Sequence, residues 1–227
     1  MRIVVSVGGS VFVPSLGDER VAAYAAVVDT LVEQGHEVGA VVGGGSVARE
    51  YIETARNLGV DEVSLDQLGI AVTRLNARLL IGALGETAVP EPLEGFERAQ
   101  EAFRRGDVPV MGGTVPGHTT DAVATALAER SSADLLVYAT SVDGVYNADP
   151  RTDDSATKFD HLTPGQLVDI IAGVELAAGS NAPVDLLAAK FLQRSGLRAI
   201  VLDGTNPEDV IHAVGGDHDG TEISTVA

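Results

Sequence analysis

The chain has 227 residues, no cysteine and a formal net charge of −18, from 33 acidic and 15 basic residues. The length allows one large α/β domain, and the absence of cysteine excludes disulfides, zinc–thiolate sites and cysteine nucleophiles. The negative charge disfavours nucleic acid and anionic membranes as partners. No apolar run suggests a bilayer-spanning segment of roughly 20 residues, so we expect a soluble, cytoplasmic protein.

Short β-branched runs alternate with stretches of helical periodicity along the whole sequence. In chain order, the predicted elements are the strand Ile3–Val7, helix Arg20–Gln34, strand Val38–Val42, helices Ser46–Leu58, Leu65–Leu84 and Gly95–Arg105, strand Val108–Met111, helix Asp121–Glu129, strand Leu135–Ala139, helices Thr163–Ile171 and Val184–Arg194, strand Ala199–Leu202, helix Pro207–His212 and a short strand within 217–227. This alternation predicts an α/β fold with an open, mostly parallel sheet sandwiched by helices, in a single domain over 1–227.

Two glycine clusters follow the first two predicted strands. They are Gly8-Gly9-Ser10 and Gly43-Gly44-Gly45-Ser46, and each precedes a helical pattern. Glycine allows backbone N–H groups to approach an anion closely, and a following helix adds its positive N-terminal end. The pattern favours one polyphosphate ligand that is bound by both turns. The simpler alternative is that these glycines only form tight turns.

Two further loops follow later strands. The segment 112–120 combines glycines with three threonines before a helix, which is typical of a monophosphate site, although Thr119 or Thr120 could be a plain N-cap. The segment 140–149 contains a turn at Asp143-Gly144 and a tyrosine, Tyr146, whose ring could pack beside a nucleobase. Because ligands of open α/β sheets gather at the carboxyl ends of strands, we expect all four loops to converge on one cleft.

Other phosphate-binding motifs fit less well. The Walker pattern is absent, because neither lysine of the chain follows a glycine. Gly43-x-Gly45-x-x-Ala48 matches the relaxed dinucleotide fingerprint, with Asp61, Glu62 or Asp66 at a suitable distance, so a nicotinamide enzyme stays open. The acidic candidates for metal binding or orientation are Asp66, Asp121, Asp143, Asp149 and Asp185. Magnesium that bridges phosphates needs only one or two carboxylates, so no metal ligand is assigned.

The motifs together resemble the amino acid kinase family, and most closely its archaeal uridylate kinase branch. The resemblance extends over nearly the whole chain and includes VGGSV at Val7–Val11, VVGGGSVAREYI at Val41–Ile52, DQLGIAVTRLNARLLIGAL at Asp66–Leu84, PVMGGTVPGHTTDAVA at Pro109–Ala124 and ADLLVYATSVDGVYNADP at Ala133–Pro150. It implies transfer of the ATP γ-phosphoryl group to UMP, with Mg²⁺ carried by ATP. It also implies a homohexamer built as a trimer of dimers.

The resemblance also implies roles for individual residues. Those expected to contact ATP are Gly9, Ser10, Gly45, Arg49, Thr140, Tyr146 and Asp149, and those expected to hold UMP are Gly44, Asp66, Thr114, Val115, Pro116, Gly117, His118, Thr119 and Thr120. The part from about residue 133 would bind mainly ATP, and the part before it mainly UMP. Many relatives carry a lysine on the first strand where this chain has Ser6. Lys158 is therefore the first candidate for the missing cation, with Arg49 as a second catalytic cation.

Two alternatives remain open from the sequence. One is another small-molecule kinase of the same fold, which would act on isopentenyl phosphate, carbamate or an amino-acid carboxylate. The other is a non-catalytic anion store or sensor on the same scaffold, which the missing first-strand lysine makes conceivable. The sequence decides neither the effectors nor the preference for UMP over CMP.

The acidic composition predicts a protein adapted to high salt. Only two of the 15 basic residues are lysines, Lys158 and Lys190, and aromatic residues make up 4% of the chain. Self-repulsion among the acids destabilises the fold unless salt screens it, and molar salt shortens the Debye length to roughly 3 Å. We therefore expect the melting temperature to rise steadily from low to molar KCl. A melting temperature that stays constant across the series would contradict this prediction.

Overall fold

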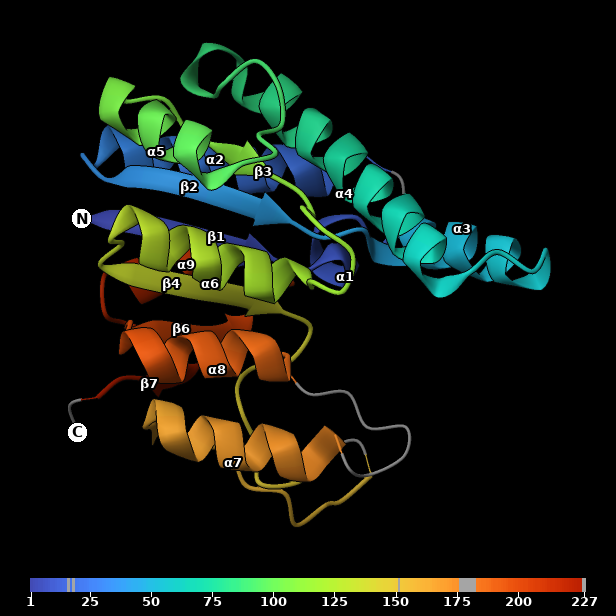
Figure 1. Ribbon diagram of the computed structural model, residues 1–227. Coiled ribbons are helices and arrows are strands. Elements are labelled where there is room, and N and C mark those ends of the chain that lie inside the picture. Colours follow the sequence, from blue (N-terminus) through green and yellow to red (C-terminus); the bar gives the residue numbers. More distant parts are fainter. Residues whose placement is uncertain (16, 18, 151, 176–182, 226–227) are drawn as a thin grey trace.

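The strands form one sheet in the order β3-β2-β1-β4-β6-β7-β5 in the computed structural model, which describes all residues except 16, 18, 151, 176–182 and 226–227 (Figure 1). The strands are β1 (Arg2–Val7), β2 (Glu37–Val42), β3 (Val110–Met111), β4 (Leu135–Thr140), β5 (His161–Leu162), β6 (Ala199–Asp203) and β7 (Thr221–Ile223). The first five strands in this order are mutually parallel, and β7 pairs antiparallel with β6 and parallel with β5. The predicted open, mostly parallel sheet is confirmed.

Helices cover both faces of this sheet (Figure 1). They are α1 (Gly9–Phe12), α2 (Glu19–Glu33), α3 (Gly45–Asn57), α4 (Glu62–Leu84), α5 (Phe96–Arg105), α6 (Thr120–Ser131), α7 (Pro164–Glu175), α8 (Leu186–Ser195) and α9 (Asp209–Val214), with a short 3₁₀ turn at Gly85–Thr87. One hydrophobic core joins α2, α4 and α9 to one face of the sheet, and a second core joins α5, α6, α7 and α8 to the other. Neighbouring strand residues enter opposite cores, as the pleat requires.

Most predicted elements agree with the structure within a few residues, and three differ for clear reasons. The predicted strand Val108–Met111 is reduced to β3, because Pro109 has no N–H to donate and Val108 instead pairs with the segment around Ala88. Helix α4 begins three residues earlier than predicted, where the Asp61 side chain accepts a hydrogen bond from Ser64 N. Helix α9 begins at Asp209 and not at Pro207, because 206–208 form a turn before it.

Helices α3 and α4 pack on each other and project beyond the edge of the sheet (Figure 1). By length and hydropathy alone, α4 is the one helix among the described residues that could cross a membrane. Its inner face, however, is buried against the protein through Leu65, Val72, Leu80 and Leu84. We therefore interpret α4 as a core helix whose outer face is unusually apolar.

Candidate functional site at the carboxyl edge of the sheet

The four loops singled out by sequence lie along one edge of the sheet. They follow β1, β2, β3 and β4, which are neighbours in the order β3-β2-β1-β4 and all run in the same direction. Their carboxyl ends therefore meet at the same edge, and the chain changes direction of winding between β1 and β4. This is the position at which open α/β sheets form a crevice for ligands.

The two glycine clusters are packed directly against each other. A Cβ atom on Gly9 would lie 2.0 Å from Gly45 N, and one on Gly43 would lie 2.4 Å from Gly9 N. Gly45 also has a φ of +67°, which side chains rarely tolerate. No side chain fits at this contact, so the turns after β1 and β2 form one continuous surface of main chain. The alternative in which each cluster is only an isolated tight turn does not explain this contact.

Two buried polar residues of α4 hold the loops after β2 and β3. Asn76 Nδ2 donates to the carbonyl of Gly43 at 2.8 Å, and Thr73 Oγ1 accepts from Gly113 N at 2.7 Å. Buried polar groups need such partners, since an unpaired one costs about 1–3 kcal/mol. Neither residue is among the site residues expected from the sequence. Their signal is the presence of polar side chains on the buried face of an otherwise apolar helix.

The loops enclose two adjoining cavities. The first, which we call the β2 cavity, has a volume of about 290 Å³. It is lined by Gly44, Gly45, Ala48, Arg49, Ile52, Asp66, Gly69, Ile70, Thr73, Gly113, His118, Thr119 and Thr120. Arg49 is the one Lys or Arg among these lining residues, and α3 and α6 begin at this cavity with their positive ends. The arrangement suits a small phosphorylated ligand.

The second, which we call the β4 cavity, has a volume of about 260 Å³. It is lined by Gly8, Ser10, Asp121, Thr140, Ser141, Val142, Gly144, Tyr146, Ala148, Asp149, Pro150, Ile170, Ile171 and Pro183. Gly8 and Ser10 flank Gly9, which touches Gly45 of the β2 cavity. Two ligands bound in the two cavities would therefore meet at the glycine contact.

The predicted site residues divide between these two cavities. Ser10, Thr140, Tyr146 and Asp149 line the β4 cavity; Gly44, Gly45, Arg49, Asp66, His118, Thr119 and Thr120 line the β2 cavity; and Gly9 lies at the contact between them. Arg49 and Gly45 are thus placed with the residues expected to bind UMP. Thr114, Val115, Pro116 and Gly117 form the outer part of the loop after β3 and do not line either cavity.

The loop after β3 is tied to the rest of the protein at both ends. Gly117 N donates to Asp66 Oδ2 at 2.8 Å, which holds the outer part of the loop against α4. Thr119 is the N-cap of α6, as the simpler interpretation of this threonine proposed, and its Oγ1 also donates to Asp185, the N-cap of α8. The Asp66 carboxylate and the Thr119 hydroxyl thus both have partners within the protein.

Asp121 lies where the two cavities adjoin, directly after Thr120. Ser6 Oγ donates to Asp121 Oδ1 at 2.9 Å, and among the described residues no Lys or Arg pairs with this carboxylate. Burial raises the pKa of Asp121 to about 7; the hydrogen bond from Ser6 opposes the shift, and the negative charge of Asp185 adds to it. Ser6, at the first-strand position where the family resemblance implies a lysine, is thus a neutral donor to a partly buried acid.

A larger cavity lies elsewhere, and its volume is about 760 Å³. Seven carboxylates line this acidic cavity, from Asp143, Asp160, Asp203, Asp209, Asp217, Asp219 and Glu222, together with Lys158, His161, His212, His218, Leu202 and Gly220. Its charge repels phosphates, so size alone does not identify the phosphate site. Lys158 faces this cavity, where its Nζ donates to Asp143 Oδ2 at 3.0 Å and to the carbonyl of Asp219 at 2.7 Å.

The topology removes the nicotinamide alternative. After α3 the chain enters α4 and not a second strand, so the βαβ unit of a dinucleotide site is not formed. Asp61 caps α4, Glu62 pairs with Arg56, and Asp66 holds Gly117. In the part of the chain that the structure describes, no three Asp, Glu, His or Cys side chains are grouped closely enough to hold a metal ion by themselves.

The raised pKa of Asp121 predicts a pH-dependent penalty on stability. In the unfolded chain this acid titrates near 3.8. As the pH rises from about 4 to about 7, the unfolded state loses its proton first, so the native state is progressively destabilised. Asp121→Asn removes this penalty, which is on the order of 4 kcal/mol above pH 7 at about 1.4 kcal/mol per pKa unit. Thermal unfolding of both proteins should give melting temperatures that diverge over this pH range. A difference in melting temperature that stays constant over this pH range would contradict the raised pKa of Asp121.

Comparison with known proteins shows the family of the chain. The model of the amino acid kinase family matches residues 1–203. A protein named uridylate kinase from Natronomonas pharaonis is 64% identical over 223 residues, covering 98% of both chains, and one from Haloarcula marismortui is 62% identical over 224 residues, covering 98% of both chains. The crystal structure of uridylate kinase from Archaeoglobus fulgidus superposes with a TM-score of 0.89 at 47% identity, covering 99% of this chain and all of the other. The chain therefore belongs to the amino acid kinase family.

Proposed function

We propose that the protein is a uridylate kinase, which transfers the γ-phosphoryl group of ATP to UMP and gives UDP and ADP. The observation that carries the proposal is the pair of cavities joined at the Gly9–Gly45 contact, which suits two anionic ligands placed end to end. The relatives named uridylate kinase, at more than 60% identity over nearly the whole chain, support UMP as the acceptor. The reaction belongs to pyrimidine nucleotide biosynthesis, and its substrates suit a cytoplasmic enzyme.

The β4 cavity is the proposed ATP site and the β2 cavity the proposed UMP site. The ring of Tyr146 and the apolar side chains of α7 offer a surface for a nucleobase in the β4 cavity. In the β2 cavity, Asp66 offers a carboxylate for ribose hydroxyls, and Arg49 offers a planar fork for phosphate oxygens. Arg49 and Gly45 would then lie where the phosphates of ATP and UMP meet. From this place they could also contact ATP, as expected from the sequence.

The chemistry requires positioning and charge neutralisation more than proton transfer. The acceptor is itself a phosphate, so it needs no strong general base, and no covalent intermediate is needed. Main-chain N–H groups of the glycine turns and the first turns of α3 and α6 would hold the phosphates in line. Arg49 would neutralise charge that develops during transfer. Lys158 was the other candidate cation from sequence, and its ammonium group is directed toward Asp143 and Asp219.

Mg²⁺ fits the donor set of the β4 cavity as a partner of bound ATP. Magnesium bound to nucleotides keeps several waters and takes one or two carboxylates, and the cavity offers Asp121 and Asp149. When bound, the ion neutralises phosphate charge and orients the γ-phosphoryl group. The protein's own contribution is to hold the Asp121 carboxylate between the two cavities through Ser6.

The proposal predicts Mg²⁺-dependent ADP release that needs UMP. In molar KCl, UMP should support the highest kcat/KM among UMP, CMP, AMP and GMP, because the relatives that share more than 60% of this sequence are named uridylate kinase. Isopentenyl phosphate, carbamate and amino acids should be poor acceptors. Coupled ADP release with each compound in turn is the measurement. Phosphorylation of one of these compounds with UMP inert would favour another kinase of the fold, and no ATP consumption with any acceptor would favour an anion store.

We also propose that the chain assembles as a homohexamer, a trimer of dimers. The support is the apolar outer face of α4, where Leu75 is 61% exposed and Leu79 is 44% exposed one turn further on. A helix face of this kind is suited to pack on a second copy of itself.

This proposal predicts that charge on the outer face of α4 lowers the assembly state. Leu75→Glu combined with Leu79→Glu would place two more negative charges in the buried interface. Light scattering after size exclusion in molar KCl should give the hexamer for the natural sequence and a smaller species for the double variant. Leu58→Glu, which changes an exposed leucine at the end of α3, is the matched control. An unchanged mass for the double variant would place the contacts elsewhere.

A further inference from the structure

A charged pair, Asp143 and Lys158, holds the hydroxyl end of the Tyr146 side chain, which lines the β4 cavity. Tyr146 Oη donates to Asp143 Oδ1 at 2.8 Å, and Lys158 Nζ donates to the other oxygen, Asp143 Oδ2, at 3.0 Å. Lys158 also donates to the carbonyl of Asp219 at 2.7 Å, just before β7. Asp143 therefore connects the tyrosine hydroxyl to a lysine that is itself bonded to the loop before β7.

The main chain fixes the same pairing. Tyr146 and Lys158 face each other in an antiparallel β-bridge, so their side chains emerge on the same side. The bridge is continued on one side by Phe159 N, which donates to the carbonyl of Val145 at 2.9 Å, and on the other by Asn147 N, which donates to that of Thr157 at 3.1 Å. Backbone hydrogen bonds therefore hold Tyr146 and Lys158 next to each other.

The stem of Lys158 is also confined. It runs over Gly144, whose φ is +155° and where a Cβ atom would lie 2.9 Å from Lys158 Cδ. The Lys158 side chain is 23% exposed, whereas Asp143 is 53% exposed. Partial burial acts against both charges, yet their mutual hydrogen bond raises the pKa of Lys158, and the bonds from Tyr146 and Lys158 lower the pKa of Asp143. The pair therefore stays ionised near neutral pH.

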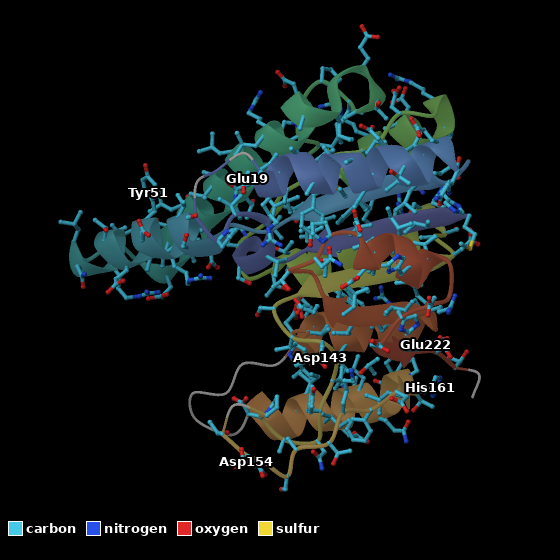
Figure 2. The ribbon with its side chains drawn as sticks, turned by 180° about the vertical axis from the view of Figure 1, so that it is seen from behind. Glu19, Tyr51, Asp143, Asp154, His161 and Glu222 are labelled. Atoms are coloured by element: carbon cyan, nitrogen blue, oxygen red, sulfur yellow. The ribbon has the colours of Figure 1, made fainter. Side chains whose placement is uncertain are left out.

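The pair lies on the far side of the tyrosine from the proposed ATP. Tyr146 lines the β4 cavity, whereas Asp143 and Lys158 line the acidic cavity. Figure 2 shows Asp143 on the half of the molecule that carries Glu222 of β7 and His161 of β5. We infer that Lys158 is a positioning residue, which acts through Asp143 to hold the Tyr146 ring as a wall for the adenosine part of ATP. This inference rests on the proposed ATP site.

The test compares Lys158→Met and Tyr146→Phe with the natural protein. Met keeps the length of the stem without its charge, and Phe keeps the ring without its hydroxyl. Both should raise the KM for ATP roughly tenfold, the scale of one lost hydrogen bond to a charged group, and leave kcat and the KM for UMP within about threefold. The double variant should be no worse than the poorer single variant, because both changes break the same connection. Lys158→Arg should restore most of the affinity, and Lys190→Met, at the chain's other lysine on α8, is the matched control.

Titration calorimetry with a non-hydrolysable ATP analogue gives a readout that needs no acceptor. The natural protein should bind the analogue. A roughly tenfold weaker affinity in both Lys158→Met and Tyr146→Phe would support the inference. A kcat loss of orders of magnitude in Lys158→Met with an unchanged KM for ATP would overturn it, and would make Lys158 the cation that neutralises the transferring phosphoryl group. Unchanged binding in Tyr146→Phe would also overturn it, even if Lys158→Met fails to fold. If the natural protein itself does not bind the analogue, the proposed function fails instead.

Discussion

The main-chain contact between Gly9 and Gly45 is the constraint on which the site depends. β1 and β2 are in register up to Val7 and Val42, so the two turns begin side by side, at the distance of neighbouring strands. Any side chain at the contact would force the turns apart, because a Cβ on Gly9 would lie within 2.0 Å of Gly45 N. The β2 and β4 cavities can therefore share a boundary made of backbone alone. Asp121, which lines the β4 cavity and directly follows Thr120 of the β2 cavity, lies close to that boundary.

Helix α4 serves the site and the surface of the molecule with opposite faces. Its inner face places Thr73 and Asn76 under the loops after β3 and β2, while its outer face exposes Leu75 and Leu79. A polar group that is buried and fully bonded fixes one geometry, because any other arrangement leaves it unpaired. The position of this one helix therefore fixes the position of two of the loops that form the site. Figure 2 shows how far the paired helix α3 carries Tyr51 away from the sheet.

Local patterns were sufficient to predict the sheet, most helices and the convergence of the four loops. Glycine after a β-branched run and periodic apolar residues are signals within one segment, and parallel strands then bring their carboxyl ends together. What the sequence did not reveal depends on contacts between distant segments. The bond of Asn76 to Gly43 joins residues 33 apart, and that of Lys158 to Asp219 joins residues 61 apart. The division of Arg49 and Lys158 between different cavities likewise follows from packing, which no local pattern specifies.

Under the proposed function, a chain with a net charge of −18 would bind two anionic nucleotides at a site that does not depend on a surplus of side-chain cations. Exposed ion pairs, such as that between Arg56 and Glu62, contribute little at high salt, because molar salt shortens the Debye length to roughly 3 Å. Backbone N–H groups at the glycine turns would act at contact distance, and their orientation is fixed by the sheet and not by free side chains. Short, directional hydrogen bonds inside a cavity lose less to screening than long-range attraction does. The same construction would therefore serve an anionic ligand in an acidic protein and would tolerate the high salt that the composition predicts.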